Sequence, residues 1–297
     1  MGKKLSDLLE GIHQSIDEEL RSRPAVVQKK PEDFDVAKLP IQKREWHRLD
    51  DVVAVAVDLK GSSKMGTGKH AASTASIYEA STGNAVRALN SFEADFIQIQ
   101  GDGAFGLFWG DKRIERALCA GITVKTFSEY LTRKIDERWP DAPSTGYKVG
   151  IARGRVLAKR VGTLRNVAEQ EPIWSGKPVN YAVKAAQSAD AGELIVTAEV
   201  WAKIESNHFL THSCGHNGGA EGRVAKIWET VSIKNLPEGS PDGRRLRSVW
   251  CATCGESFCD SVLKGERFRD EVMNEVLKQA RGVQDALHSA HLSGLAQ

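Results

Sequence analysis

The sequence predicts an α+β fold, and two observations support it. The run of Val and Ala at 51–58 is typical of a central strand buried on both faces. After a polar, alanine-rich segment at 69–92, which favours a long helix, apolar runs at 96–100 and 104–109 flank the turn Gly101-Asp102-Gly103. Asp-Gly between apolar runs indicates a β-hairpin. The core therefore opens as strand, helix, strand, strand.

The later segments extend this order. We expect a helix at 112–137, strands at 147–152 and 155–161, a helix at 179–188 and a strand at 194–197. Beyond Trp201 the thiols gather and periodicity weakens, until the apolar stripe of a last helix at 267–291.

The N-terminal region differs from the core. Apolar residues recur at helical spacing from Leu5 to Arg21 and predict an amphipathic helix that needs a partner surface. Three prolines among charges at 23–46 indicate a linker or a strap. We therefore divide the chain into an N-terminal helix and linker at 1–48, a core domain at 49–205 and an accessory tail at 206–297.

Composition bounds the function. The 297 residues carry a net charge of +2, so no basic field favours nucleic acid as a partner. There is no apolar run long enough to span a membrane, and the first residues lack the apolar core of a secretion signal, so we expect a cytoplasmic protein. Five cysteines in such a chain indicate reduced thiols or metal ligands rather than disulfides.

Two aspartates carry the strongest chemical signal. Asp58 ends the first apolar strand and Asp102 lies in the hairpin turn. If their strands are neighbours, both carboxylates can share hard divalent cations through oxygen. The backbone N–H groups of the turn Gly61-Ser62-Ser63 can receive phosphate oxygens. The alternative is that Asp58 caps a helix and Asp102 only serves the turn.

The tail holds a second candidate site. His212, Cys214 and His216 alternate along one segment, and Cys251 and Cys254 form a Cys-x-x-Cys pair. We expect Cys214, His216, Cys251 and Cys254 to be the ligands of a closed, structural Zn²⁺ site. A small buried cluster of reduced cysteines is an equal alternative. Cys259 lies near the pair in sequence, whereas Cys119, alone on a helix, is expected in the core.

Four segments follow one another in a characteristic order and at characteristic intervals: Asp58-Leu59-Lys60-Gly61-Ser62-Ser63, Gly101-Asp102-Gly103, Val149-Gly150-Ile151-Ala152-Arg153-Gly154 and Trp174-Ser175-Gly176-Lys177-Pro178-Val179-Asn180-Tyr181-Ala182. In these segments the chain resembles the class III nucleotidyl cyclases. The resemblance implies a ferredoxin-like βαββαβ catalytic core for 49–205.

The resemblance also implies a reaction. In such cyclases the ribose 3′-hydroxyl attacks the α-phosphate and expels pyrophosphate, while two Mn²⁺ or Mg²⁺ ions are held by two aspartates. These correspond to Asp58 and Asp102, with the Leu59 carbonyl as a further ligand. Asn180 matches the asparagine that orients the ribose, and Lys184 stands where the family has an arginine. Because the family builds its sites across a dimer, a homodimer with composite active sites is implied.

The base-selecting positions depart from the purine cyclases. They are occupied by Gln98 and Ile173, where adenine-specific members carry lysine and aspartate. Gln98 offers a donor and an acceptor to a pyrimidine edge, and Ile173 narrows the pocket. The chain is therefore most similar to the bacterial pyrimidine cyclases of antiphage defence, and this resemblance implies a cyclase that makes cyclic UMP from UTP, with CTP as the weaker choice, to trigger a separate effector protein. A purine cyclase with unusual base contacts and a non-catalytic nucleotide sensor are the alternatives.

Overall fold

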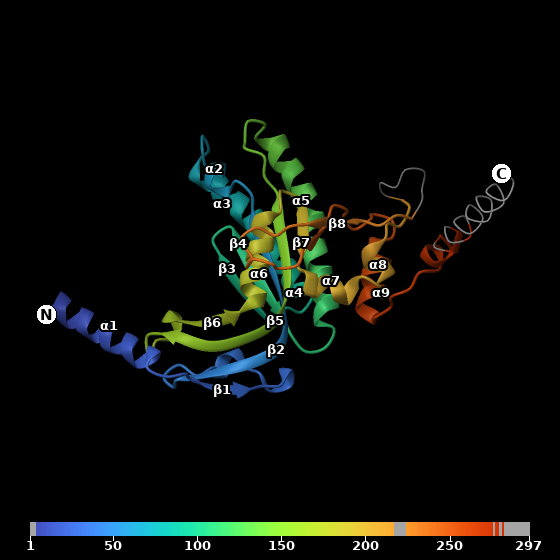
Figure 1. Ribbon diagram of the computed structural model, residues 1–297. Coiled ribbons are helices and arrows are strands. Elements are labelled where there is room, and N and C mark those ends of the chain that lie inside the picture. The colour runs from blue at the N-terminus through green and yellow to red at the C-terminus, as the bar shows by residue number, and fades with distance from the viewer. Residues whose placement is uncertain (1–3, 217–223, 276, 279–280, 282–297) are drawn as a thin grey trace, which may run out of the picture. The chain divides into compact units, whose positions relative to one another are not determined.

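The computed structural model describes residues 4–216, 224–275, 277–278 and 281 (Figure 1). The chain forms two compact units. One contains Met1–Val52 and Gly154–Lys177, and the other contains Val53–Arg153 and Pro178–Gln297. Two long strands, β2 (Glu45–Leu59) and β5 (Tyr147–Gly162), contribute residues to both. The predicted α+β class is confirmed.

The first unit contains the predicted N-terminal helix, α1 (Leu5–Leu20), none of whose residues is buried. Arg44 anchors the end of this helix, because its Nη2 donates to the carbonyl oxygen of Glu19 at 2.8 Å. The segment predicted as a linker contains a short strand, β1 (Ala25–Gln28), which pairs in parallel with the start of β2. Two short 3₁₀ turns follow it, at Pro31–Asp33 and Val36–Lys38.

The rest of the first unit contains a β-hairpin and a small buried core. β6 (Gln170–Gly176) pairs antiparallel with the second half of β5, from Val156 opposite Gly176 to Gly162 opposite Gln170. Phe34 packs against Trp174 with ring centroids 6.0 Å apart, and against His47 at 6.4 Å.

The second unit holds the main core. Its strands follow the order β3-β4-β2-β5-β7-β9-β8. The further elements of this unit are α2 (Ser62–Met65), α3 (Ala71–Tyr78), a π turn (Glu79–Gly83), α4 (Asn84–Ser91), β3 (Phe96–Gln100), β4 (Gly103–Phe108), α5 (Arg113–Arg138), α6 (Lys177–Ser188), β7 (Glu193–Val196), α7 (Ala198–Ile204), α8 (His208–Thr211), β8 (Trp228–Val231), β9 (Gly243–Leu246) and α9 (Gly255–Lys264).

Helices α5 and α6 cover opposite faces of this sheet (Figure 1). A Cβ atom at Gly121 of α5 would lie 2.8 Å from Cδ1 of Ile151. A Cβ atom at Gly150 would lie 1.9 Å from the carbonyl oxygen of Ala182 in α6. Because neighbouring residues of a strand point to opposite faces, these two contacts place the helices on different sides. Glycine at position 150 is what allows α6 to approach the sheet so closely.

The predicted long helix at 69–92 is interrupted. It is divided into α3, the π turn and α4. Within the π turn the hydroxyl of Ser81 donates to the carbonyl oxygen of Ile77 at 2.7 Å, a local bond that competes with regular helix bonding. The predicted strands at 147–152 and 155–161 are instead one continuous strand, β5.

The tail contains strands that its sequence pattern does not indicate. β9 pairs with β7 and β8 pairs with β9, so this part of the tail extends the sheet. Each strand has four residues and β9 reads Gly-Arg-Arg-Leu, too short and too polar for a strand signal. Of the predicted last helix at 267–291, residues 270–275 are helical, and most of the remainder lies outside the described residues. Nowhere in the described ranges is a helix long and apolar enough to cross a lipid bilayer.

Candidate active site

Asp58 and Asp102 lie at the same end of two paired strands. β2 and β4 are antiparallel with Val57 opposite Ala104, so Asp58 comes next to Gly103 and its preceding residue Asp102. The backbones touch at this point, because a Cβ atom at Gly103 would lie 2.6 Å from the carbonyl oxygen of Val57. The sequence expectation that the two aspartates belong to neighbouring strands is therefore met, and glycine is required between them.

A lysine that the sequence reasoning missed neutralises Asp58. Lys148 of β5 forms an ion pair with the Asp58 carboxylate, and its side chain is 17% exposed against 43% for Asp58. The signal available in the sequence was a single charge inside the apolar run 147–152. A second ion pair joins Asp190 to Lys60, the residue that follows the end of β2. The hydrogen bond from Lys60 lowers the pKa of Asp190.

A buried phenol lies beside both aspartates. Tyr147 is fully buried and packs edge-on against Phe127, with ring centroids 5.7 Å apart. Burial raises the pKa of Tyr147 to about 12, and the charges of Asp102 and Asp58 add to the rise. The neighbouring hydroxyls of Ser81 and Thr82 oppose it. The two carboxylates therefore help to keep the Tyr147 phenol protonated and neutral.

The turn after Asp58 has the shape that the sequence predicts. Leu59 is the last residue of β2 and its side chain is buried. Gly61 has a positive φ of 73°, which glycine adopts without strain, and Ser62 and Ser63 open the short helix α2. The backbone of Gly61, Ser62 and Ser63 is thus a tight turn next to Asp58.

Helix α6 presents the next two predicted residues. Asn180 is exposed and Lys184 is partly buried, and because they are four residues apart they share one helix face. The ammonium of Lys184 lies over the ring of Tyr181, 5.9 Å from its centroid. The contact of Ala182 with Gly150 fixes this helix on the sheet.

The two base-selecting candidates lie in different units. Gln98 is a partly buried residue of β3, opposite Phe105 of β4. Ile173 of β6 is 42% exposed, next to the buried Trp174. Each therefore has a side chain that a small ligand can reach.

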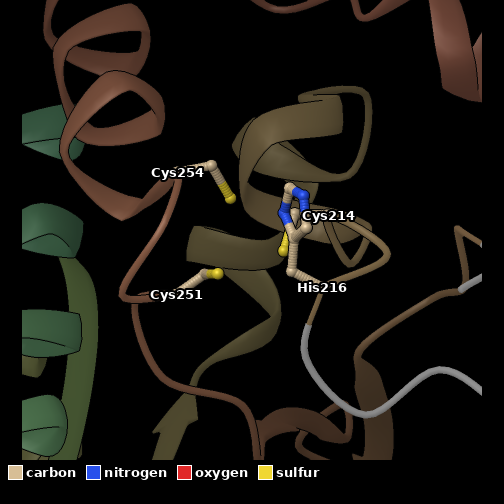
Figure 2. A group of neighbouring side chains, drawn as sticks. All are labelled: Cys214, His216, Cys251 and Cys254. Atoms are coloured by element: carbon tan, nitrogen blue, oxygen red, sulfur yellow. The ribbon is translucent and has the colours of Figure 1, made fainter.

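The tail cluster comes together as a group of four (Figure 2). The ligand atoms of Cys214, His216, Cys251 and Cys254 all lie within 4.8 Å of one another, a donor set able to bind a metal ion. Cys259 is not in this group: it contacts Cys119, and that contact together with burial raises the pKa of the Cys119 thiol. Cys119 is fully buried, as predicted for a core residue.

Two known proteins are similar to this chain in sequence over most of its length. No protein-family model matches the chain. The chain is 47% identical to a uridylate cyclase of Propioniciclava tarda over 268 residues, which are 90% of this chain and 86% of that protein. It is 46% identical to a uridylate cyclase of Micromonospora echinofusca over 274 residues, 91% of this chain and 88% of that protein.

A solved structure shares the fold at low sequence identity. The crystal structure of an adenylyl cyclase from P. aeruginosa superposes with a TM-score of 0.53 and 14% identity, covering 68% of this chain and 95% of that one. This likeness confirms the expected class III cyclase core. With the close relatives it leads to one conclusion: the chain belongs to the uridylate cyclase family of nucleotidyl cyclases, which are phosphorus–oxygen lyases.

Proposed function

We propose that the protein converts UTP to 3′,5′-cyclic UMP and pyrophosphate. The observation that carries this proposal is the close relationship to two uridylate cyclases along nine-tenths of the chain. The pairing of Asp58 with Gly103, which brings two carboxylates to one strand end, is the local feature that supports it.

Asp58, Asp102 and the Leu59 carbonyl would hold two divalent cations, Mn²⁺ or Mg²⁺. Their fit is supported by the donors, which are hard oxygens at the end of paired strands, and by the exposure of the Asp58 side chain. When bound, such cations lower the pKa of the ribose 3′-hydroxyl and offset the charge that develops on the α-phosphate. The neutral phenol of Tyr147 adds no negative charge beside the carboxylates.

The remaining residues would bind and orient the nucleotide. Asn180 would hold the ribose so that its 3′-hydroxyl faces the α-phosphate, and Lys184 would place a positive charge by the phosphate oxygens. The backbone N–H groups of Gly61, Ser62 and Ser63 would bind the triphosphate. By resemblance to class III cyclases, Asn180 and Lys184 of one subunit would serve the aspartates of the other, in a homodimer.

Gln98 and Ile173 would select the base. The Gln98 amide carries both a donor and an acceptor, which suits the carbonyl and N3 edge of uracil. By resemblance to class III cyclases, Ile173 would be the second residue that contacts the base. CTP is the second candidate substrate. By resemblance to the pyrimidine cyclases of antiphage defence, the product would activate a separate effector protein.

A product assay tests the proposal. The full chain is incubated separately with UTP, CTP, ATP and GTP in the presence of Mn²⁺, and the products are identified by mass. We expect cyclic UMP from UTP, with pyrophosphate in equal amount. Cyclic AMP or cyclic GMP as the main product would establish a purine cyclase, and absence of pyrophosphate with all four nucleotides would establish a non-catalytic nucleotide sensor.

A further inference from the structure

The tail cluster has the donor spacing of a tetrahedral zinc site. Three thiol sulfurs and one imidazole nitrogen lie within 4.8 Å of one another. Zn–S bonds of about 2.3 Å in tetrahedral geometry separate the donors by about 3.8 Å, so small side-chain rotations suffice to close the site around an ion. Figure 2 shows the sulfurs of Cys214, Cys251 and Cys254 directed toward a common point, with the ring of His216 beside them.

The Cys251–Cys254 turn is already folded as a ligand turn. The backbone N–H of Thr253 donates to the sulfur of Cys251 at 3.4 Å, and the N–H of Gly255 donates to the Cys251 carbonyl oxygen at 2.7 Å. An N–H bond to sulfur stabilises the thiolate over the thiol, and the thiolate is the form that binds metal. Cys254 immediately precedes α9, so its sulfur is held at a helix start.

A buried arginine lies next to the cluster. Arg269 is 6% exposed, and its Nη1 donates to the carbonyl oxygens of Ser213 at 3.0 Å and His212 at 3.2 Å. Its guanidinium stacks on Phe258, 4.4 Å from the ring centroid. The carboxylate paired with it belongs to Glu271, at 3.8 Å, whose side chain is 70% exposed and therefore a weak counter-charge.

The charge of Arg269 is what a three-thiolate site requires. Zinc bound by three thiolates and one neutral histidine carries a net charge of −1, which is costly in a partly buried place unless a cation lies near. The guanidinium is bonded to the carbonyl oxygen of Ser213, the residue that directly precedes the ligand Cys214. The arginine and the ligand set therefore match in charge as well as in position.

We propose that Cys214, His216, Cys251 and Cys254 bind one structural zinc ion, with Arg269 as a positioning residue that offsets its charge. Four protein ligands leave no open coordination position, so this ion would not take part in the cyclase reaction. It would instead join the segment after α8 to the turn before α9.

The site would hold the tail on α5. Trp250, next to the Cys251–Cys254 turn, donates from its indole Nε1 to Oγ1 of Thr123 in α5 at 3.1 Å. Phe209 of α8 packs edge-on against Phe258 of α9 with ring centroids 5.3 Å apart. Leu210 of α8 and Val262 of α9 belong to the main apolar core, so a zinc ion would add to this packing by fixing the two loop segments that carry its ligands.

Metal content tests this directly. The full chain is purified under reducing conditions without chelator, and its metals are measured by mass spectrometry. We expect about one zinc per chain, lost in Cys251→Ser and Cys254→Ser and retained in Cys259→Ser. Cys259 is the matched control because it lies on α9 but contacts Cys119 instead of the cluster. Zinc-free protein that takes up no zinc, a Cys251–Cys254 disulfide, or equal loss in Cys259→Ser would overturn the proposal.

Two further variants separate ligation from folding. His216 is exposed, so His216→Ala removes a ligand without disturbing the packing, and we expect weaker zinc binding in a folded protein. Arg269→Gln should weaken zinc binding by about 10- to 100-fold, as other residues behind metal ligands do. With Co²⁺ in place of zinc, the visible bands of tetrahedral cobalt should appear in the wild type. Unchanged affinity in His216→Ala, or octahedral cobalt bands, would exclude this ligand set. These measurements do not depend on the proposed cyclase reaction.

Discussion

The ammonium of Lys148 on β5 forms an ion pair with the carboxylate of Asp58 on β2. The residue before Lys148 on β5 is Tyr147, and the charges of Asp102 and Asp58 contribute to the raised pKa of its phenol. If Asp58 served only the structure, its neutralisation would lower the stability of the protein. If it serves catalysis, neutralisation would lower activity and leave stability nearly unchanged.

We expect Asp58→Asn and Asp102→Asn to lower cyclase activity by at least about 100-fold, because the amide removes the charge that binds cations and keeps the shape. The free energy of unfolding should change by less than about 1 kcal/mol, since the ion pair of Asp58 is partly exposed. Product formation and urea denaturation are the measurements. Asp190→Asn, which breaks the similar Lys60–Asp190 pair, is the control and should keep activity within a few-fold of wild type. Full activity in Asp58→Asn would refute its role.

The approach of β4 to β2 predicts that Gly103→Ala is harmful. The added methyl would lie 2.6 Å from the Val57 carbonyl oxygen and would push the turn that carries Asp102 away from Asp58. Overpacking of this kind costs about 1 to 3 kcal/mol. Gly106→Ala on the same strand is the comparison, because its methyl would meet side chains and no backbone: Leu89 at 3.1 Å and Ala94 at 3.5 Å. If both variants lose activity and stability equally, the contact with Val57 has no special role.

Substitutions of Lys184 test whether its positive charge serves catalysis. A lysine brings charge but lacks the planar fork with which an arginine binds two phosphate oxygens. Lys184 lies on the same face of α6 as Asn180, with its ammonium over the Tyr181 ring. We expect Lys184→Arg to retain or raise kcat, and Lys184→Met to lower it by about 100-fold with little change in KM for UTP. A kcat in Lys184→Met equal to that of wild type would show that this lysine only serves the surface of the helix.

Tyr147 predicts a loss of stability at high pH. Its pKa is raised to about 12 in the folded protein, so the folded state holds the phenolic proton more tightly than the unfolded state, whose tyrosine has a pKa near 10. The contribution is complete below pH 10 and is lost as the pH rises through 12, by about 2 to 3 kcal/mol in total.

Comparison of wild type with Tyr147→Phe isolates this effect from other titrating groups. Urea denaturation at pH 8, 10 and 11 should show a steeper fall for the wild type than for the variant. At pH 8 the variant should be nearly as stable, because no group in the described part of the chain makes a hydrogen bond of standard geometry with the Tyr147 hydroxyl. Parallel pH profiles would mean that the phenol is not shielded from solvent.

The sequence predicts the parts of this fold that have strong periodicity. The apolar run before Asp58 and the Asp-Gly turn locate β2, β3 and β4 within one or two residues, except that β2 begins earlier, at Glu45. β8 and β9 cannot be found in this way, because strands of only four residues carry no pattern distinct from a loop. The π turn is likewise invisible, since the residues around Ser81 are compatible with a regular helix.

Some residues of the candidate site can likewise be found from the sequence, and others cannot. Asp58 and Asp102 can be paired from sequence because a hairpin and a preceding strand are expected to be neighbours. Lys148 and Tyr147 cannot, because the ion pair of Lys148 with Asp58 and the effect of both aspartates on Tyr147 arise where β5 meets β2, a pairing between segments far apart in the chain. The tail ligands are found from residue type and spacing alone, while Arg269 emerges only from its burial among the carbonyl groups of the His212–Ser213 segment.

The π turn at Glu79–Gly83 sets how many residues must separate α3 from α4. Each residue of an α-helix turns the chain by about 100°, so the deletion of one residue here would swing the inner side of α4, formed by Ala85, Ala88 and Leu89, away from the strands beneath it. Relatives that keep this packing must therefore keep the same residue count between α3 and α4, whatever side chains they place there.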